Sequence, residues 1–137
     1  MSEAVKFHKQ GKIGIITLDR PDHKNTITAK IAMAFSEIKA QIDYGSDVAA
    51  LVITGNGQEA FCAGTDVYDE AAWENGEQRI QRLQIASMVG SYNQPVIAAI
   101  NGDAFDQGLE LALAIDIRIA SSSACFAMSQ IRTLISR

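Results

Sequence analysis

The stretch Phe61-Cys-Ala-Gly-Thr-Asp66 decides the fold, because it follows the apolar run Val48-Ala-Ala-Leu-Val-Ile-Thr-Gly55. That run does not alternate between apolar and polar residues, so it predicts a strand covered on both faces. A second passage of the same kind follows, in which Pro95-Val-Ile-Ala-Ala-Ile-Asn-Gly102 precedes a loop and a helix that carries Glu110. Each passage has a glycine at its turn. Two such turns can direct two backbone N–H groups at one point, which is what holding charge on a carbonyl oxygen requires.

Hydrophobic periodicity extends this pattern to the whole chain and predicts one α/β domain over residues 1–137. Strand, helix and strand follow one another in the order of a right-handed winding with parallel strands. The chain stops at Arg137 after an uncapped apolar segment, so we expect a fold truncated at its C-terminus. The predicted elements are a hairpin over 5–19, helices over 28–44, 77–92 and 108–115, and strands over 48–55, 96–100 and 116–121.

Composition excludes several classes of protein. Hydrophobic residues make up 47% and charged residues 20% of the chain, as in soluble globular proteins. No apolar run is long enough for a membrane span, and the N-terminus has no export pattern, so we expect a cytoplasmic protein. A net charge of −4 with scattered basic residues argues against nucleic-acid binding. Cys62 and Cys125 lack metal-ligand spacing and are expected as reduced thiols in the core, and neither histidine suggests a metal site.

Glu110 is the single carboxylate in the otherwise apolar helix Gly108-Leu-Glu-Leu-Ala-Leu-Ala-Ile115. A helix that is apolar all round is buried, and a buried carboxylate is suited to work as a general acid or base near neutral pH. The alternative is that Glu110 lies in the first turn, faces water and complements the helix dipole. The sequence does not decide between the two.

The two loops are ambiguous in the same way. Gly64 permits backbone angles that let the N–H of Thr65 point out of the chain, but Asp66 can equally be the N-cap of an ordinary turn into a helix. Asp106 can likewise cap the helix that follows it.

Four separated motifs nevertheless resemble one family, the enoyl-CoA hydratase/isomerase (crotonase) superfamily. They are Phe61–Asp66, Ala98–Gly102, Gly108–Ala114 and Asp116–Ser121, and they occur in order with the expected gaps. Leu18-Asp-Arg-Pro21 followed by Asn25 resembles the N-terminal signature of the same family. The resemblance implies a crotonase-like (ClpP/crotonase) ββα superhelix of parallel strands and helices, of which this chain covers the N-terminal half to two-thirds.

The resemblance also implies a role for each matching position. The backbone N–H groups of Thr65 and Gln107 match the two donors of an oxyanion hole, and Glu110 matches one of two glutamates that handle water and protons. The implied substrate is an acyl-CoA thioester, with no separate cofactor because coenzyme A is part of the substrate. A homo-oligomer, trimer or hexamer, is also implied. The implied substrate-binding residues are Lys24, Asn25, Thr26 and Ile27 on one side of the pocket, and Ala63, Gly64, Asp66, Val67 and Tyr68 on the other.

Three departures from the family pattern change what we expect. The family's run of glycines is Ala104-Phe-Asp-Gln-Gly108 here, and Asp106 brings a negative charge near a site for an anion. The second glutamate falls at Gln130, whose amide can orient a water but cannot act as an acid or base. The C-terminal helices of the family are absent.

A reaction run by one carboxylate, such as isomerisation, dehydration or hydrolysis, therefore fits better than two-glutamate hydration. The alternative is a non-catalytic module that binds acyl-CoA or serves in assembly. A nucleotide-binding domain fits poorly, because no G-x-G-x-x-G follows the first strand.

Overall fold

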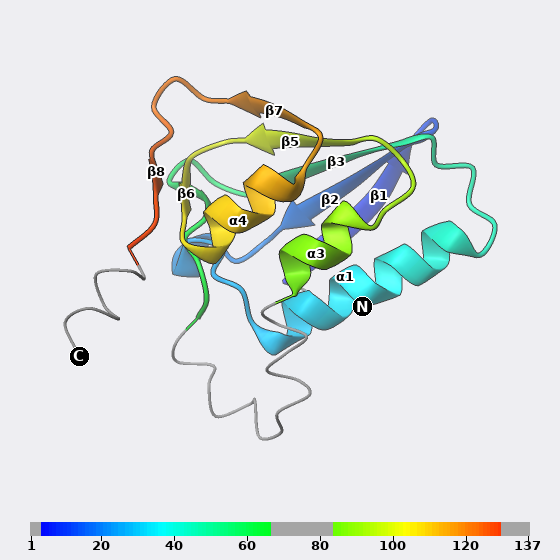
Figure 1. Ribbon diagram of the computed structural model, residues 1–137, viewed down its shortest axis with the longest axis horizontal. Coiled ribbons are helices and arrows are strands. Elements are labelled where there is room, and N and C mark those ends of the chain that lie inside the picture. Colours follow the sequence, from blue (N-terminus) through cyan, green and yellow to red (C-terminus); the bar gives the residue numbers. More distant parts are fainter. Residues whose placement is uncertain (1–3, 67–83, 130–137) are drawn as a thin grey trace.

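The computed structural model describes residues 4–66 and 84–129, and Figure 1 shows their arrangement. The predicted helix over 28–44 is present with Thr28 as its N-cap, since the Thr28 hydroxyl accepts from the N–H of Ile31. The predicted helix over 77–92 is described only in its last part, because residues 77–83 lie outside the described ranges. The elements in chain order are β1 (Val5–Gln10), β2 (Ile13–Leu18), the 3-10 helix η1 (Pro21–His23), α1 (Ala29–Asp43), β3 (Ala50–Gly55), β4 (Ala60–Cys62), α3 (Ile85–Gly90), β5 (Val96–Ile100), β6 (Asp103–Phe105), α4 (Gln107–Ala114), β7 (Ile117–Ala120) and β8 (Phe126–Ala127).

The main sheet has five strands in the order β1-β2-β3-β5-β7. β1 and β2 form the predicted antiparallel hairpin, with Gly11 at a φ of 61° in its turn. The pairs β2–β3, β3–β5 and β5–β7 are all parallel. The prediction of a parallel α/β winding is therefore confirmed.

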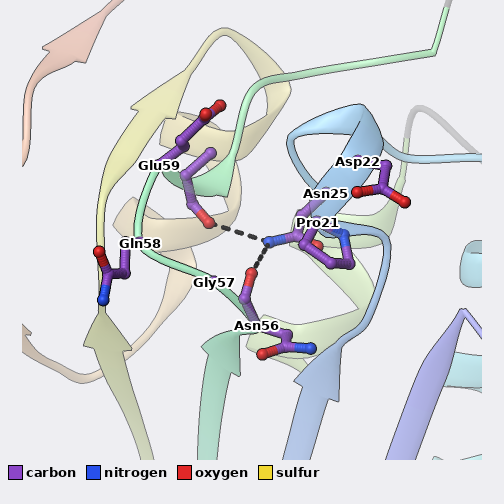
Figure 2. Close-up of a pocket in the computed structure, with 8 residues that line it drawn as sticks. Pro21, Asp22, Asn25, Asn56, Gly57, Gln58 and Glu59 are labelled. Atoms are coloured by element: carbon purple, nitrogen blue, oxygen red, sulfur yellow. Dashed lines mark hydrogen bonds between the residues drawn. The ribbon is translucent and has the colours of Figure 1, made fainter.

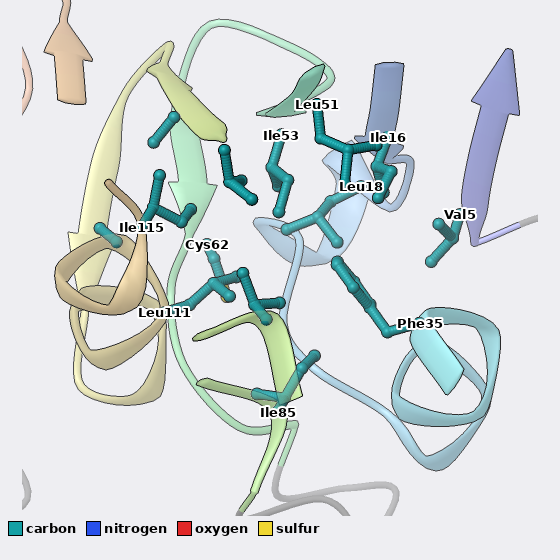
Figure 3. Close-up of a cluster of buried hydrophobic side chains, with 14 of the residues drawn as sticks. Val5, Ile16, Leu18, Phe35, Leu51, Ile53, Cys62, Ile85, Leu111 and Ile115 are labelled. Atoms are coloured by element: carbon teal, nitrogen blue, oxygen red, sulfur yellow. The ribbon is translucent and has the colours of Figure 1, made fainter. Parts of the chain in front are cut away.

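One face of this sheet carries the core. Figure 1 shows α1, α3 and α4 along the same side of the sheet, and Figure 3 shows the side chains that fill the space between. Phe35 of α1 and Leu111 of α4 are fully buried there. Each fully buried side chain of this size contributes roughly 1.5–3 kcal/mol to folding.

The other face of the sheet is less covered than the sequence predicted. Burial alternates along β3, where Leu51, Ile53 and Gly55 are buried and the residues between them are half-buried. The expectation of a strand covered on both faces is therefore wrong within the described residues. The apolar composition of β3 predicted a fully buried strand, but α1, α3 and α4 pack on one face alone.

A second, three-stranded sheet has the order β4-β6-β8, and all its pairs are parallel. The sequence analysis missed it, because its strands are two or three residues long and carry no readable alternation. This small sheet matters for function, since the two glycine-containing turns leave it from β4 and β6.

Candidate functional site

The turns that follow β4 and β6 lie against each other. The Thr65 hydroxyl donates to the side-chain oxygen of Gln107 over 2.5 Å. Gly108 packs so closely on β4 that a Cβ built on it would lie 2.0 Å from the carbonyl oxygen of Cys62. The structure thus brings together the two turns that the sequence paired.

The direction of the Thr65 N–H follows from the backbone pairing on either side of it. The Gly64 carbonyl accepts from Ile27 N–H over 2.7 Å, and Asp66 N–H donates to the Ile27 carbonyl over 3.0 Å. In an extended chain, the backbone groups of neighbouring residues point to opposite edges. The Gly64 carbonyl and the Asp66 N–H both face Ile27, so the N–H of Thr65 between them faces away from Ile27. Across residues 4–66 and 84–129, no backbone or side-chain group accepts from it. Gly64 has a φ of 112°, the left-handed geometry that its lack of Cβ permits.

Gln107 supplies the matching position on the second turn. It is the first residue of α4, so its N–H is among those that have no acceptor within the helix. Its side chain is 2% exposed and accepts the bond from Thr65. The side chain at this position is therefore accommodated by burial between the two turns.

The loop of residues 24–27 lies on the other side of Gly64 and Thr65. Ala63 N–H donates to the Lys24 carbonyl over 3.0 Å, and Ile27 and Thr65 form an isolated parallel bridge. Lys24 and Asn25 both have a left-handed φ, of 52° and 55°. The structure therefore gathers the predicted substrate-binding residues 24–27 and 63–66 in one place.

Asn25 holds this loop in its unusual conformation. Its side chain is fully buried and accepts from the N–H of Arg20 over 2.8 Å. Its amide donates to the carbonyls of Asn56 and Ala60 over 3.0 and 2.9 Å. Figure 2 marks hydrogen bonds of Asn25 with dashed lines. All these bonds stay within the protein, so the Asn25 side chain is a structural element of the site.

Arg20 is a residue of this site that sequence reasoning missed. Its guanidinium donates to the Thr26 carbonyl over 2.7 Å and forms an ion pair with Asp66 over 2.8 Å. The two charged side chains are only 17% and 9% exposed. The pair therefore ties the 24–27 loop to the end of the β4 turn. The signal was present in Leu18-Asp-Arg-Pro21, but nothing in the sequence placed Asp66 beside it.

Two cavities adjoin the loops. One of about 370 Å³ is lined by Lys24, Glu59, Ala60, Ala63, Asp103 and Phe105. The other, of about 340 Å³, is shown in Figure 2 and is lined by Pro21, Asp22, Asn25, Asn56, Gly57, Gln58, Glu59 and Ala60. The first is the relevant one for a ligand, because two predicted substrate-binding residues, Lys24 and Ala63, line it.

Glu110 does not lie in the buried setting that one interpretation of the sequence required. α4 packs through Gln107, Gly108, Leu111 and Ala112, and Glu110 lies outside this packed face, exposed to solvent. Leu113, on the same side, is 60% exposed. The expectation of a helix buried all round is wrong for the described residues, because only one face of α4 is covered there.

Two further predictions are corrected. Asp106 makes no side-chain capping bond to α4; its carboxylate instead accepts from the backbone N–H and hydroxyl of Ser129. Cys125 is exposed rather than part of the core, whereas Cys62 is buried. Burial raises the pKa of Cys62 to about 12, so its thiol stays protonated at neutral pH.

Three predicted site residues, Val67, Tyr68 and Gln130, lie outside the described residues. Among the described residues, no group of His, Cys, Asp or Glu side chains could hold a metal ion. In the same part of the chain, none of the helices has the length and apolar character that crossing a bilayer requires.

Fold and site together define an α/β protein in which the turns after two short parallel strands meet at one point. The chain belongs to the enoyl-CoA hydratase/isomerase family, whose sequence model matches residues 8–135. The predicted family and the crotonase-type fold are thereby confirmed.

Individual relatives agree with this assignment. The chain is 32% identical over 130 residues to the short-chain-enoyl-CoA hydratase of Clostridium acetobutylicum, covering 93% of this chain and 50% of that protein. It is 36% identical over 132 residues to the carnitinyl-CoA dehydratase of Citrobacter koseri, covering 95% and 50%. The crystal structure of an enoyl-CoA hydratase from Bacillus anthracis superposes with a TM-score of 0.84 at 32% identity, covering 96% of this chain and 52% of that one. The chain thus spans about half the length of the curated relatives it matches.

Proposed function

We propose that this chain binds acyl-CoA thioesters and holds the thioester oxygen with the backbone N–H groups of Thr65 and Gln107. The observation that carries the proposal is the contact between the two turns, made by the Thr65 hydroxyl and the Gln107 side chain. Family membership supports the substrate class, since the relatives are named for reactions of CoA thioesters.

The chemistry needs such donors because negative charge develops on the thioester oxygen when a proton leaves or joins the α-carbon. Donors that are already in position stabilise that enolate without reorganising, and one such donor is typically worth about 2.7–4 kcal/mol. The Thr65 N–H suits this task, because it points away from Ile27 and has no acceptor in the described part of the chain.

The CoA portion would lie along the loop of residues 24–27. Lys24 lines the cavity of about 370 Å³ next to Ala63, and an ammonium group there suits the phosphates of CoA. Asp66 would contribute through its backbone, since its carboxylate is held by Arg20 and the residue is 7% exposed. The geometry of this loop therefore favours a ligand that runs from the cavity to the two turns.

We further propose that Glu110 is the acid or base. It lies three positions after Gln107 on α4, so a substrate held at the Gln107 N–H from the solvent side is within one helical turn of its carboxylate. With an amide at position 130, one carboxylate would run the reaction, which favours isomerisation, dehydration or hydrolysis over hydration by two glutamates.

The test compares turnover and binding in the purified chain. A panel of short enoyl-CoA thioesters is assayed spectrophotometrically with the wild type, Glu110→Gln and Glu37→Gln. Glu37 is an exposed carboxylate on α1, so its variant makes the same change of charge away from the site. We expect Glu110→Gln to abolish turnover with thioester binding nearly intact, and Glu37→Gln to behave as the wild type. Equal activity in Glu110→Gln would overturn the role of Glu110.

The oxyanion donors are tested separately by infrared spectroscopy of a bound saturated acyl-CoA labelled at its carbonyl carbon. Two N–H donors polarise the carbonyl, so its stretching frequency should fall on binding. An unshifted frequency would overturn the proposed hole. A shifted frequency without turnover of any thioester in the panel would instead identify the chain as the non-catalytic binding module.

A further inference from the structure

Asp106 combines an unusual backbone conformation with an unusual set of bonds. It has a φ of 54° and a ψ of −116°, a combination that glycine adopts readily and other residues rarely. A residue that keeps a side chain in such a conformation needs surrounding contacts that hold it there.

Those contacts come from the end of β8 and from the residues that follow it. The Asp106 N–H donates to the Ala127 carbonyl over 2.8 Å. One carboxylate oxygen accepts from the Ser129 N–H over 2.5 Å, and the other accepts from the Ser129 hydroxyl over 2.6 Å. The backbone and the side chain of Asp106 are thus both fixed to the same short stretch of chain.

The conformation of Asp106 also determines where the Gln107 N–H points. That N–H belongs to the peptide plane between the two residues, and rotation about ψ of Asp106 turns the plane. A Cβ built on Gly64 would lie 3.4 Å from the Cβ of Asp106, so the fixed residue also lies against the turn that carries Thr65.

We infer that Asp106 is a positioning residue: with Ser129 it forms a clamp that aims the Gln107 N–H at the ligand. The inference rests on the proposed function, because it concerns the same pair of donors. The clamp also explains how a carboxylate is tolerated beside a site for an anion, since its two oxygens face the Ser129 donors.

Three substitutions separate this role from a merely structural one. Asp106→Gly removes the clamp and at the same time removes the backbone strain. Asp106→Asn keeps an acceptor for the Ser129 N–H while removing the charge, and asparagine tolerates a positive φ. Asp103→Ala is the matched control, because the Asp103 carboxylate accepts from the Cys125 N–H over 3.0 Å at the other end of β8, away from the Gln107 peptide.

The first measurement needs no activity. The NMR order parameter of the Gln107 amide in the full chain should be about 0.85 in the wild type, as in rigid backbone, and below about 0.6 in Asp106→Gly. The melting temperature of that variant should be equal or higher, because the strain is gone. Asp106→Asn and Asp103→Ala should leave the Gln107 order parameter at its wild-type value. An unchanged order parameter in Asp106→Gly, or a lower one only in step with a lower melting temperature, would overturn the clamp.

The second measurement uses turnover. If the donors are aimed by the clamp, Asp106→Gly should lower kcat about tenfold or more with little change in KM, and Asp106→Asn should retain most of kcat. A rise in kcat in both variants would overturn the inference, since it would mean that the negative charge only opposes the enolate. A wild-type chain that turns over no thioester would refute the proposed activity, and the order-parameter measurement would still decide the clamp.

Discussion

Replacing Gly108 by alanine tests the contact that joins the two turns. A Cβ at this position would lie 2.0 Å from the Cys62 carbonyl oxygen and 2.7 Å from its carbonyl carbon, where real Cβ atoms essentially never come closer than 3.0 Å. The atoms in the way are backbone, which no rotamer change can move. α4 must therefore shift from β4 by about 1 Å or more, a distance that also stretches the bond between Thr65 and Gln107.

The loss of stability expected for Gly108→Ala can be compared with the gain that alanine usually gives in a helix. Alanine in place of glycine within a helix usually stabilises by about 0.5–1 kcal/mol. Forcing an extra methyl group into a packed site costs roughly 1–3 kcal/mol, and losing a hydrogen bond about 1 kcal/mol more. We expect Gly108→Ala to lower the free energy of unfolding by about 1–3.5 kcal/mol, a large part of a typical total of roughly 5–15 kcal/mol.

Urea denaturation followed by circular dichroism measures this loss. With a slope near 2 kcal/mol per molar urea, the midpoint should fall by roughly 0.5–1.8 M. Gly90→Ala in α3 is the control, because the nearest heavy atom to a Cβ built there, the Ala114 carbonyl oxygen, is 4.0 Å away. Its midpoint should stay the same or rise. A midpoint for Gly108→Ala equal to that of the wild type would refute the close packing of α4 on β4.

Four other outcomes follow from the described contacts. Asn25→Ala should cost about 2–4 kcal/mol, because it leaves buried backbone partners unsatisfied and puts alanine at a φ of 55°; a melting temperature equal to the wild type's would contradict this. A thiol reagent at pH 8 should label Cys125 at once and Cys62 only after unfolding, so rapid labelling of two thiols in the native chain would refute the burial of Cys62. Burial raises the pKa of Cys62 from 9.0 to about 12. The contribution of this thiol to stability is therefore complete below pH 9 and is lost as pH rises towards 12, so the urea midpoint should fall over that interval. A urea midpoint independent of pH would contradict the raised pKa of Cys62. Finally, a double-mutant cycle with Arg20→Met and Asp66→Asn should give a coupling energy of about 1–3 kcal/mol, and additive effects would show that the ion pair contributes nothing.

The parts of the fold that the sequence predicted are those with a long local pattern. The hairpin and α1 have apolar residues at a readable period, β3 and β5 are continuous apolar runs, and the turn at Gly64 was indicated by its position after a strand. The small sheet of β4, β6 and β8 was missed, since two or three residues give no period.

The sequence predicted residues of the site, but not most of the hydrogen bonds and ion pairs that join them. Thr65 and Gln107 were paired correctly as neighbours, because the carboxyl ends of parallel strands meet at one edge. The bonds from Asp66 to Arg20 and from Asp106 to Ser129 join residues 46 and 23 positions apart, and composition carries no signal for such contacts. The exposure of Glu110 was also undecided, since an apolar helix does not reveal which of its faces the chain covers.

The order of strands in the main sheet has a consequence for synthesis on the ribosome. β3 pairs with β2 before it and with β5 after it, and Val96 of β5 follows Gly55 of β3 by 41 positions. At ~5–20 residues per second, the growing edge of the nascent sheet waits roughly 2–8 s for its next strand. During that interval Leu51 and Ile53 lack much of their final cover, so this apolar part of the emerging polypeptide stays exposed until the later elements are made.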